Sequence, residues 1–147
     1  MEKPMDAQHD CDQEHNMIVG YLATVTDQFQ TTHYRKQAER VKAFWPNVTE
    51  WIEPADMGWS LTEWLSNWEN ILPKLNLLVV IPRPDMTVGR GCWQEIDDCR
   101  ARKIPIYIAT NTGFVRKFKT ARLPGNNYRR WTRIEINSKQ EINDGDT

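Results

Sequence analysis

Cysteine and histidine are scarce in this chain, with three of each among 147 residues. Cys11, Cys92 and Cys99 have no spacing typical of metal ligands, and an odd number of cysteines does not suit a disulfide framework. Neither a His-Glu-x-x-His motif nor a Ser-His-Asp order occurs, so a zinc hydrolase site and a serine triad both lack support. We therefore expect reduced thiols, no metal and no cofactor.

The chain also lacks a long apolar run and a charge of one sign. Its longest apolar run, 75–82, is far shorter than the roughly 20 residues that cross a bilayer. The polar segment 1–16 has no apolar stretch of a signal peptide. The net charge of −1 argues against a nucleic-acid partner, because proteins that track phosphates usually carry a cationic excess. We expect a cytoplasmic protein without a membrane partner, although the basic segment 116–133 leaves a local anion site open.

Nothing in the sequence divides the chain into several domains. It holds no internal repeat, no low-complexity tract and no linker. Its 39% of hydrophobic residues are enough for one core. We expect a flexible arm at 1–16, one domain at 17–137 and a flexible tail at 138–147.

Short apolar runs alternate with amphipathic segments. The apolar runs predict strands at 17–23, 48–52, 75–81 and 104–109, with an edge strand at 131–136. Apolar residues with a period of 3.6 and capping residues predict helices at 31–45 and at 92–103. A third predicted helix begins at Ser60 with a Ser-x-x-Glu capping box and ends at Pro73. Alternation of this kind implies right-handed crossovers and a parallel sheet. The predicted fold class is α/β: a three-layer, Rossmann-like sandwich with about five mostly parallel strands and helices on both faces.

Five of the seven tryptophans lie between residues 45 and 68. Apolar residues of the second predicted helix recur at i, i+3, i+4, i+7 and i+11, which predicts a stripe that faces the core: Leu61, Trp64, Leu65, Trp68 and Leu72. Trp45, Trp51 and Trp59 lie outside this stripe and suggest a subunit contact.

The segment 88–95 is the strongest local signal for a site, because ligands of open parallel sheets bind beyond the carboxyl ends of the strands. Gly89 and Gly91 permit a close backbone approach, and the helix that follows directs N–H groups toward an anion or a ribose hydroxyl. Glu95 lies one turn into that helix, where a carboxylate can attack an anomeric carbon or stabilise an oxocarbenium ion. In the alternative interpretation, the glycines only form a turn and Glu95 complements the helix dipole.

Two segments resemble the signature regions of the nucleoside 2-deoxyribosyltransferases and related nucleotide N-glycosidases. The first is Tyr21-Leu22-Ala23, and the second is 91–96 (Gly-Cys-Trp-Gln-Glu-Ile) followed by 101–106 (Ala-Arg-Lys-Ile-Pro-Ile). The resemblance covers roughly residues 17–109 and extends to uncharacterised phage-encoded relatives. It implies that Glu95 is the nucleophile and Tyr21 its hydrogen-bonding partner, in a homo-oligomer where one subunit completes its neighbour's site.

Residues near the predicted strand ends are candidates for binding the substrate. A phosphate needs donors, and the nearest in sequence are Arg90, Thr87 and the N–H groups of Gly89 and Gly91, with Arg83 as a further possibility. The resemblance adds an acidic residue after the central strand, for which Asp85 is the candidate. Ala23, at the end of the first strand, completes the predicted set.

The sequence thus predicts cleavage or transfer at the N-glycosidic bond of a nucleoside, nucleotide or related ribosyl compound. A catalytically inactive module that sequesters a nucleotide is the alternative, since Asn76 stands where the family usually carries an aspartate. An interaction protein built on the tryptophans is a third interpretation. Cys92 is either activated by the helix N-terminus or buried and inert.

Overall fold

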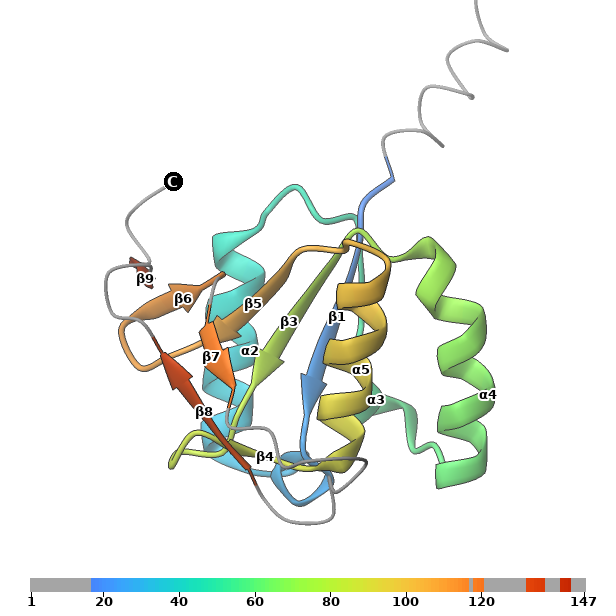
Figure 1. The fold of residues 1–147 in the computed structure, drawn as a ribbon, viewed down its shortest axis with the longest axis horizontal. Coiled ribbons are helices and arrows are strands. Elements are labelled where there is room, and N and C mark those ends of the chain that lie inside the picture. The colour runs from blue at the N-terminus through green and yellow to red at the C-terminus, as the bar shows by residue number, and fades with distance from the viewer. Residues whose placement is uncertain (1–16, 117, 121–131, 137–140, 144–147) are drawn as a thin grey trace, which may run out of the picture.

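The computed structural model of the protein describes residues 17–116, 118–120, 132–136 and 141–143 (Figure 1). The predicted arm 1–16 lies outside the described residues. Of the predicted tail, only 141–143 are described, and these residues form a strand on the main sheet.

The main sheet has six strands in the order β2-β1-β3-β5-β6-β9, and its first four strands are parallel (Figure 1). Strands β6 and β9 extend it in antiparallel pairing. The strands are β1 (Val19–Thr24), β2 (Glu50–Ile52), β3 (Leu77–Ile81), β5 (Ile106–Ala109), β6 (Gly113–Val115) and β9 (Glu141–Asn143). The predicted α/β fold with a mostly parallel sheet is therefore confirmed.

A second, smaller sheet pairs three antiparallel strands in the order β4-β8-β7. They are β4 (Thr87–Val88), β7 (Phe118–Thr120) and β8 (Thr132–Ile136). The predicted edge strand 131–136 corresponds to β8, whereas β4 lies between the predicted strand 75–81 and the predicted helix 92–103, where no strand was predicted.

Helices cover both faces of the main sheet (Figure 1). On one face, α2 packs on β1 and β3 through Tyr34, Ala38 and Val41. On the other face, Trp93 and Ile96 of α5 join the core with Trp68 of α4. The helical segments are η1 (Thr26–Gln28), α2 (Thr32–Phe44), α3 (Pro54–Met57), α4 (Leu61–Ile71), η2 (Leu72–Lys74) and α5 (Arg90–Ala101). No helix of the described segments has the length and apolar character needed to cross a bilayer.

The predicted capping box opens α4. Ser60 Oγ accepts a hydrogen bond from the Glu63 N–H at 3.2 Å, and Glu63 Oε1 accepts one from the Ser60 N–H at 2.9 Å. Both N–H groups would otherwise lack a partner within the helix. The cap fixes where α4 begins, and therefore which of its residues can reach the sheet.

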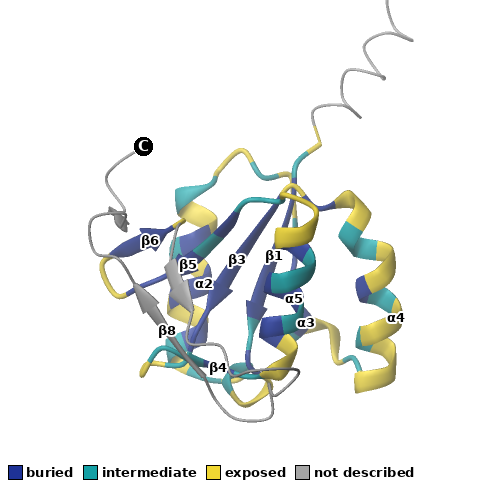
Figure 2. Cartoon of the chain, viewed as in Figure 1, coloured by how far each residue is buried: buried dark blue, intermediate teal, exposed yellow. Residues whose placement is uncertain are grey.

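The predicted core stripe of α4 is only partly correct. Trp68 is buried, but 74% of Leu61 and 42% of Leu65 are exposed. The helix lies beside α5 at the margin of its layer, and much of its surface faces outward (Figures 1 and 2). Only one side of α4 therefore meets the core, and Leu61 and Leu65 remain outside it.

Two tryptophans predicted for a subunit contact pack within the chain. Trp45 meets the rings of Phe44, Tyr107 and Phe114 at centroid distances of 4.7 to 4.9 Å. Trp51 covers Gly20, where an added Cβ would lie 2.5 Å from the indole ring. Gly20 is therefore required for the close approach of β1 and the Trp51 ring.

Candidate active site

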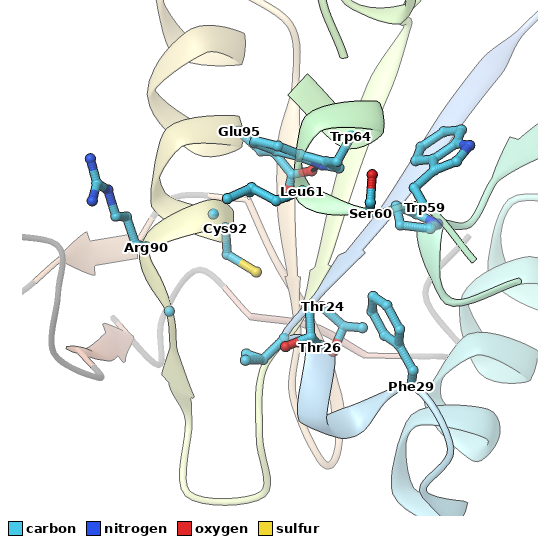
Figure 3. A pocket seen from close by; sticks show the side chains of 14 residues that line it. Thr24, Thr26, Phe29, Trp59, Ser60, Leu61, Trp64, Arg90, Cys92 and Glu95 are labelled. Atoms are coloured by element: carbon cyan, nitrogen blue, oxygen red, sulfur yellow. Dashed lines mark hydrogen bonds between the residues drawn. The ribbon is translucent and has the colours of Figure 1, made fainter. Parts of the chain in front are cut away.

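A cavity of about 420 Å³ opens beyond the carboxyl end of β1, beside the N-terminus of α5 (Figure 3). This is the edge at which open parallel sheets bind ligands. Its walls come from the residues after β1, from the segment that begins α4 and from the first turns of α5. The lining residues are Thr24, Val25, Thr26, Phe29, Pro54, Trp59, Ser60, Leu61, Trp64, Gly89, Arg90, Gly91, Cys92 and Glu95.

The structure brings Tyr21 and Glu95 together although 74 residues separate them. The Tyr21 hydroxyl donates a hydrogen bond to Glu95 Oε2. Trp64 Nε1 lies 3.0 Å from this oxygen and 3.0 Å from the Tyr21 hydroxyl, and it donates to both. β1, α4 and α5 thus each contribute one side chain to a single hydrogen-bonded cluster.

Both donors of this cluster address the same carboxylate oxygen. Among the described residues, none donates to Oε1 of Glu95, while the side chain itself lines the cavity. An ionised carboxylate only accepts hydrogen bonds, so Oε1 keeps its lone pairs for a ligand. Oε2 is therefore held by two hydrogen bonds, whereas Oε1 is available to contact a ligand.

Burial decides the charge state of the cluster. Only 3% of Glu95 is exposed, and burial raises its pKa to about 7. Hydrogen bonds from Tyr21 and Trp64 lower the pKa, whereas the negative charge of Asp98 raises it further. Burial also raises the pKa of Tyr21, which therefore stays protonated and able to donate. Near neutral pH, Glu95 exchanges between its acid and carboxylate forms.

Three of the predicted substrate-binding residues line the cavity, and three do not. Gly89, Arg90 and Gly91 stand at its wall where α5 begins. Ala23 is instead buried in the core below it, and Asp85 and Thr87 lie outside the lining.

The placement of Asp85 and Thr87 outside this lining has a local cause. Met86 N–H donates to the Arg83 carbonyl at 2.8 Å, and Arg83 N–H to the Thr87 carbonyl at 3.1 Å, which closes a tight turn with Met86 at φ 70°. Asp85 accepts hydrogen bonds from the hydroxyl and the N–H of Thr87, and these bonds hold its pKa below the usual range. The Asp85 carboxylate therefore stabilises the turn by accepting hydrogen bonds from Thr87.

Another candidate side chain also has a structural partner. Arg83, the further phosphate candidate, forms an ion pair with Asp27.

Burial raises the pKa of Cys92 well above its ordinary value, so the thiol stays protonated, which agrees with the interpretation of Cys92 as buried and inert. Within the described ranges, no group of three or more His, Cys, Asp or Glu side chains is placed to hold a metal ion.

Sequence reasoning missed the role of Trp64, which it assigned to the core. A partly buried indole N–H usually finds an acceptor, and that rule is the available signal. The hydroxyls of Thr24 and Thr26 and the ring of Phe29 were missed as well, although they follow directly after β1. The general position of sites at strand ends points to them.

Comparison with known proteins gives no match to a protein-family model, a curated protein or a solved structure. The geometry of the chain itself therefore has to define the class of site. It is an α/β cavity at the carboxyl edge of a parallel sheet, with a buried glutamate held by a tyrosine and a tryptophan.

Proposed function

We propose that this protein is an enzyme that cleaves or transfers at the N-glycosidic bond of a nucleoside, nucleotide or related ribosyl compound, with Glu95 as the nucleophile. One observation carries the proposal: a buried carboxyl lines an aromatic cavity, with both of its donors on one oxygen. The resemblance of 91–96 and of Tyr21-Leu22-Ala23 to the transferase and N-glycosidase family agrees with this assignment.

The chemistry needs the carboxylate form of Glu95. Oε1 attacks the anomeric carbon of the sugar, a C–O ester bond forms, and the bond to the base nitrogen breaks with its electron pair leaving on the base. Water then attacks the same carbon in a hydrolase, and a second base attacks it in a transferase; in both cases the attacking group loses a proton and the departed base gains one. Either attack releases the Glu95 carboxylate. Tyr21 and Trp64 hold Oε2 throughout, so the carboxylate plane stays fixed.

The walls of the cavity suit a nucleoside. Phe29, Trp59 and Trp64 provide aromatic surface on which a base can stack. The Thr26 hydroxyl offers a donor and an acceptor for sugar hydroxyls. The Thr24 hydroxyl, which donates to the Ile81 carbonyl, offers an acceptor, and the Ser60 hydroxyl, which accepts from the Glu63 N–H, offers a donor. The volume of about 420 Å³ lies within the range of small-molecule sites, about 300–1,000 Å³.

The start of α5 gives the cavity its positive end. Arg90 and the N–H groups at Gly89 and Gly91 would take a phosphate, because a helix N-terminus favours an anion. A nucleotide would then lie with its phosphate at α5 and its sugar beside Glu95.

A sequestering module without turnover is the second candidate. Asn76 favours it, since its side chain accepts a hydrogen bond from the Val19 N–H at 2.8 Å and thus supports the start of the sheet. The Asn76 amide thus has a structural role and, unlike the aspartate of the family, provides no carboxyl group for a reaction. This candidate predicts tight nucleotide binding and no free base.

Chromatography of reaction mixtures separates the two candidates. Wild-type protein is incubated with a panel of nucleosides and nucleotides, and free base is measured; calorimetry reports binding on the same panel. We expect base release from wild type, none from Glu95→Gln, and full release from Glu50→Gln, whose side chain is exposed on β2. Undiminished release by Glu95→Gln would refute the nucleophile, and binding without release by wild type would favour sequestration.

A further inference from the structure

Trp68 lies behind both groups that donate to Glu95. Its ring is stacked on Trp64, with centroids 6.3 Å apart and planes inclined by 7°. It also meets the ring of Tyr21 edge-on, with centroids 4.9 Å apart. Only 2% of Trp68 is exposed, so the ring is enclosed on all sides. A shift of this indole would therefore displace the rings of both donors, Tyr21 and Trp64.

Asp98 anchors Trp68. Trp68 Nε1 donates to Asp98 Oδ2 at 2.9 Å, and Asp98 follows Glu95 by three residues on α5. Positions i and i+3 lie on the same side of a helix. The same helix thus carries the carboxyl that receives the two donors and the carboxyl that holds the ring behind them.

This anchor matters because the other core contacts of α4, those of Trp64 and Ile71, are only partly buried. Trp68 is the buried residue of α4, whereas Leu61 and Leu65 are exposed. The position of Trp64 therefore depends on how Trp68 is seated. Because hydrogen bonds weaken steeply as their geometry degrades, a small rotation of α4 would weaken the bond from Trp64 to Glu95.

We propose that Trp68 and Asp98 are positioning residues: the hydrogen bond between them seats α4 so that Trp64 and Tyr21 both reach Oε2 of Glu95. Neither residue lines the cavity, so they act through the donors rather than on a ligand. The consequence for reaction rate rests on the proposed function. The consequence for the ionisation of Glu95 does not.

The charge of Asp98 acts in the opposite direction to its anchoring role. As a nearby anion it raises the pKa of Glu95, whereas the donors that it helps to seat lower that pKa. The other titratable groups in electrostatic contact with Glu95 are Tyr21, Cys92 and Cys99, and burial raises the pKa of each. These three groups stay neutral below pH 8. A test therefore has to separate only the charge of Asp98 from its hydrogen bond to Trp68.

Two substitutions at Asp98 separate them. Asp98→Asn and Asp98→Ala both remove the charge, but only asparagine keeps an oxygen that can accept from Trp68. The pKa of Glu95 is measured by ¹³C NMR on protein labelled at the glutamate side-chain carboxyl, and Glu95→Gln assigns the signal. We expect the pKa in Asp98→Ala to exceed that in Asp98→Asn by about one unit, since a hydrogen bond to a charged group contributes about that much.

A second variant tests the other partner of the anchor. Trp68→Phe keeps an aromatic ring and the charge of Asp98 but loses the indole N–H, so the pKa of Glu95 should rise above the wild-type value. Trp45→Phe is the matched control, because Trp45 packs in the other core cluster and should leave that pKa unchanged. Equal pKa values in Asp98→Ala and Asp98→Asn, or no rise in Trp68→Phe, would overturn the inference.

Rates measured on the same variants distinguish this inference from the proposed function. Well below the pKa, a rise of one unit lowers the carboxylate fraction about tenfold, so kcat/KM at pH 5.5 should be about tenfold lower in Asp98→Ala than in Asp98→Asn. The two variants should converge above pH 9, which a loss of structure would not produce. Shifted pKa values without base release would leave the positioning role intact and refute the N-glycosidic function. Base release with unshifted pKa values would support the N-glycosidic function and refute the positioning role.

Discussion

The buried carboxyl of Glu95 should make the stability of the protein depend on pH, and Glu95→Gln isolates that dependence. Burial raises the pKa of Glu95 from an ordinary value of 4.5 to about 7. In the unfolded chain the group loses its proton near pH 4.5, whereas in the folded protein it keeps the proton to about pH 7. Its contribution to stability is therefore fully present below pH 4.5 and is lost as the pH rises through 7.

The magnitude follows from the two pKa values. Between pH 5 and pH 8, the free energy of unfolding of the wild type should fall by about 2.5 kcal/mol relative to Glu95→Gln. Glutamine has nearly the same shape and cannot ionise, so Tyr21 and Trp64 can still donate to its amide oxygen. A loss of this size is a sizeable share of the roughly 5–15 kcal/mol that stabilise an ordinary domain.

Urea unfolding at pH 5, 6, 7 and 8 provides the measurement. The two proteins differ only at residue 95, so the difference between their stabilities reports Glu95 alone. We expect the curves to diverge mainly between pH 5 and 7 and to run parallel above pH 8. If their difference stays constant within about 0.5 kcal/mol across the range, Glu95 has an ordinary pKa and the reasoning about burial is wrong.

Three further predictions concern the cluster, the core and the assembly. Tyr21→Phe removes a donor from Glu95, so its pKa and the rising limb of the pH profile for base release should move up by about one unit, as a series of rates from pH 5 to 9 would show. Gly20→Ala places a Cβ against the Trp51 ring and should destabilise the protein by about 1–3 kcal/mol in urea unfolding; unchanged stability would mean that the ring has room to move. Light scattering at micromolar concentration should give at least twice the mass of one chain, and a monomer would contradict the homo-oligomer that the family resemblance implies.

The parts of this protein that sequence reasoning predicts are those with a long repeating pattern or a clear end signal. The apolar run ending at Ile81 predicts the buried strand β3, and the capping box at Ser60 fixes the start of α4. Tyr21 and Glu95 meet because one lies near the carboxyl end of β1 and the other lies just beyond the first turn of α5, which begins at the same edge. Topology brings these ends together whatever the details of the loops.

The remaining features depend on contacts that have no local pattern. A 3.6-residue period says which side of α4 is apolar, but not that the helix lies at the margin of its layer, so the exposure of Leu61 and Leu65 was not predictable. The two-residue strand β4 is too short to show a period, and its pairing with β8 depends on residues far along the chain. Asp85 looked available because its capture by Thr87 is a matter of turn geometry.

The balance of forces at Glu95 explains why a carboxyl would be held in this way. Full solvation would give it an ordinary pKa and a strongly hydrated charge, which makes a weak nucleophile. Burial without donors would keep it protonated at neutral pH, and an acid cannot attack. Tyr21 and Trp64 restore ionisation by hydrogen bonding to one oxygen, and the other oxygen takes no hydrogen bond from the described residues. Such a site lowers the stability of the fold near neutral pH, so the divergence between wild type and Glu95→Gln measures what the reactive form of the carboxyl costs the fold.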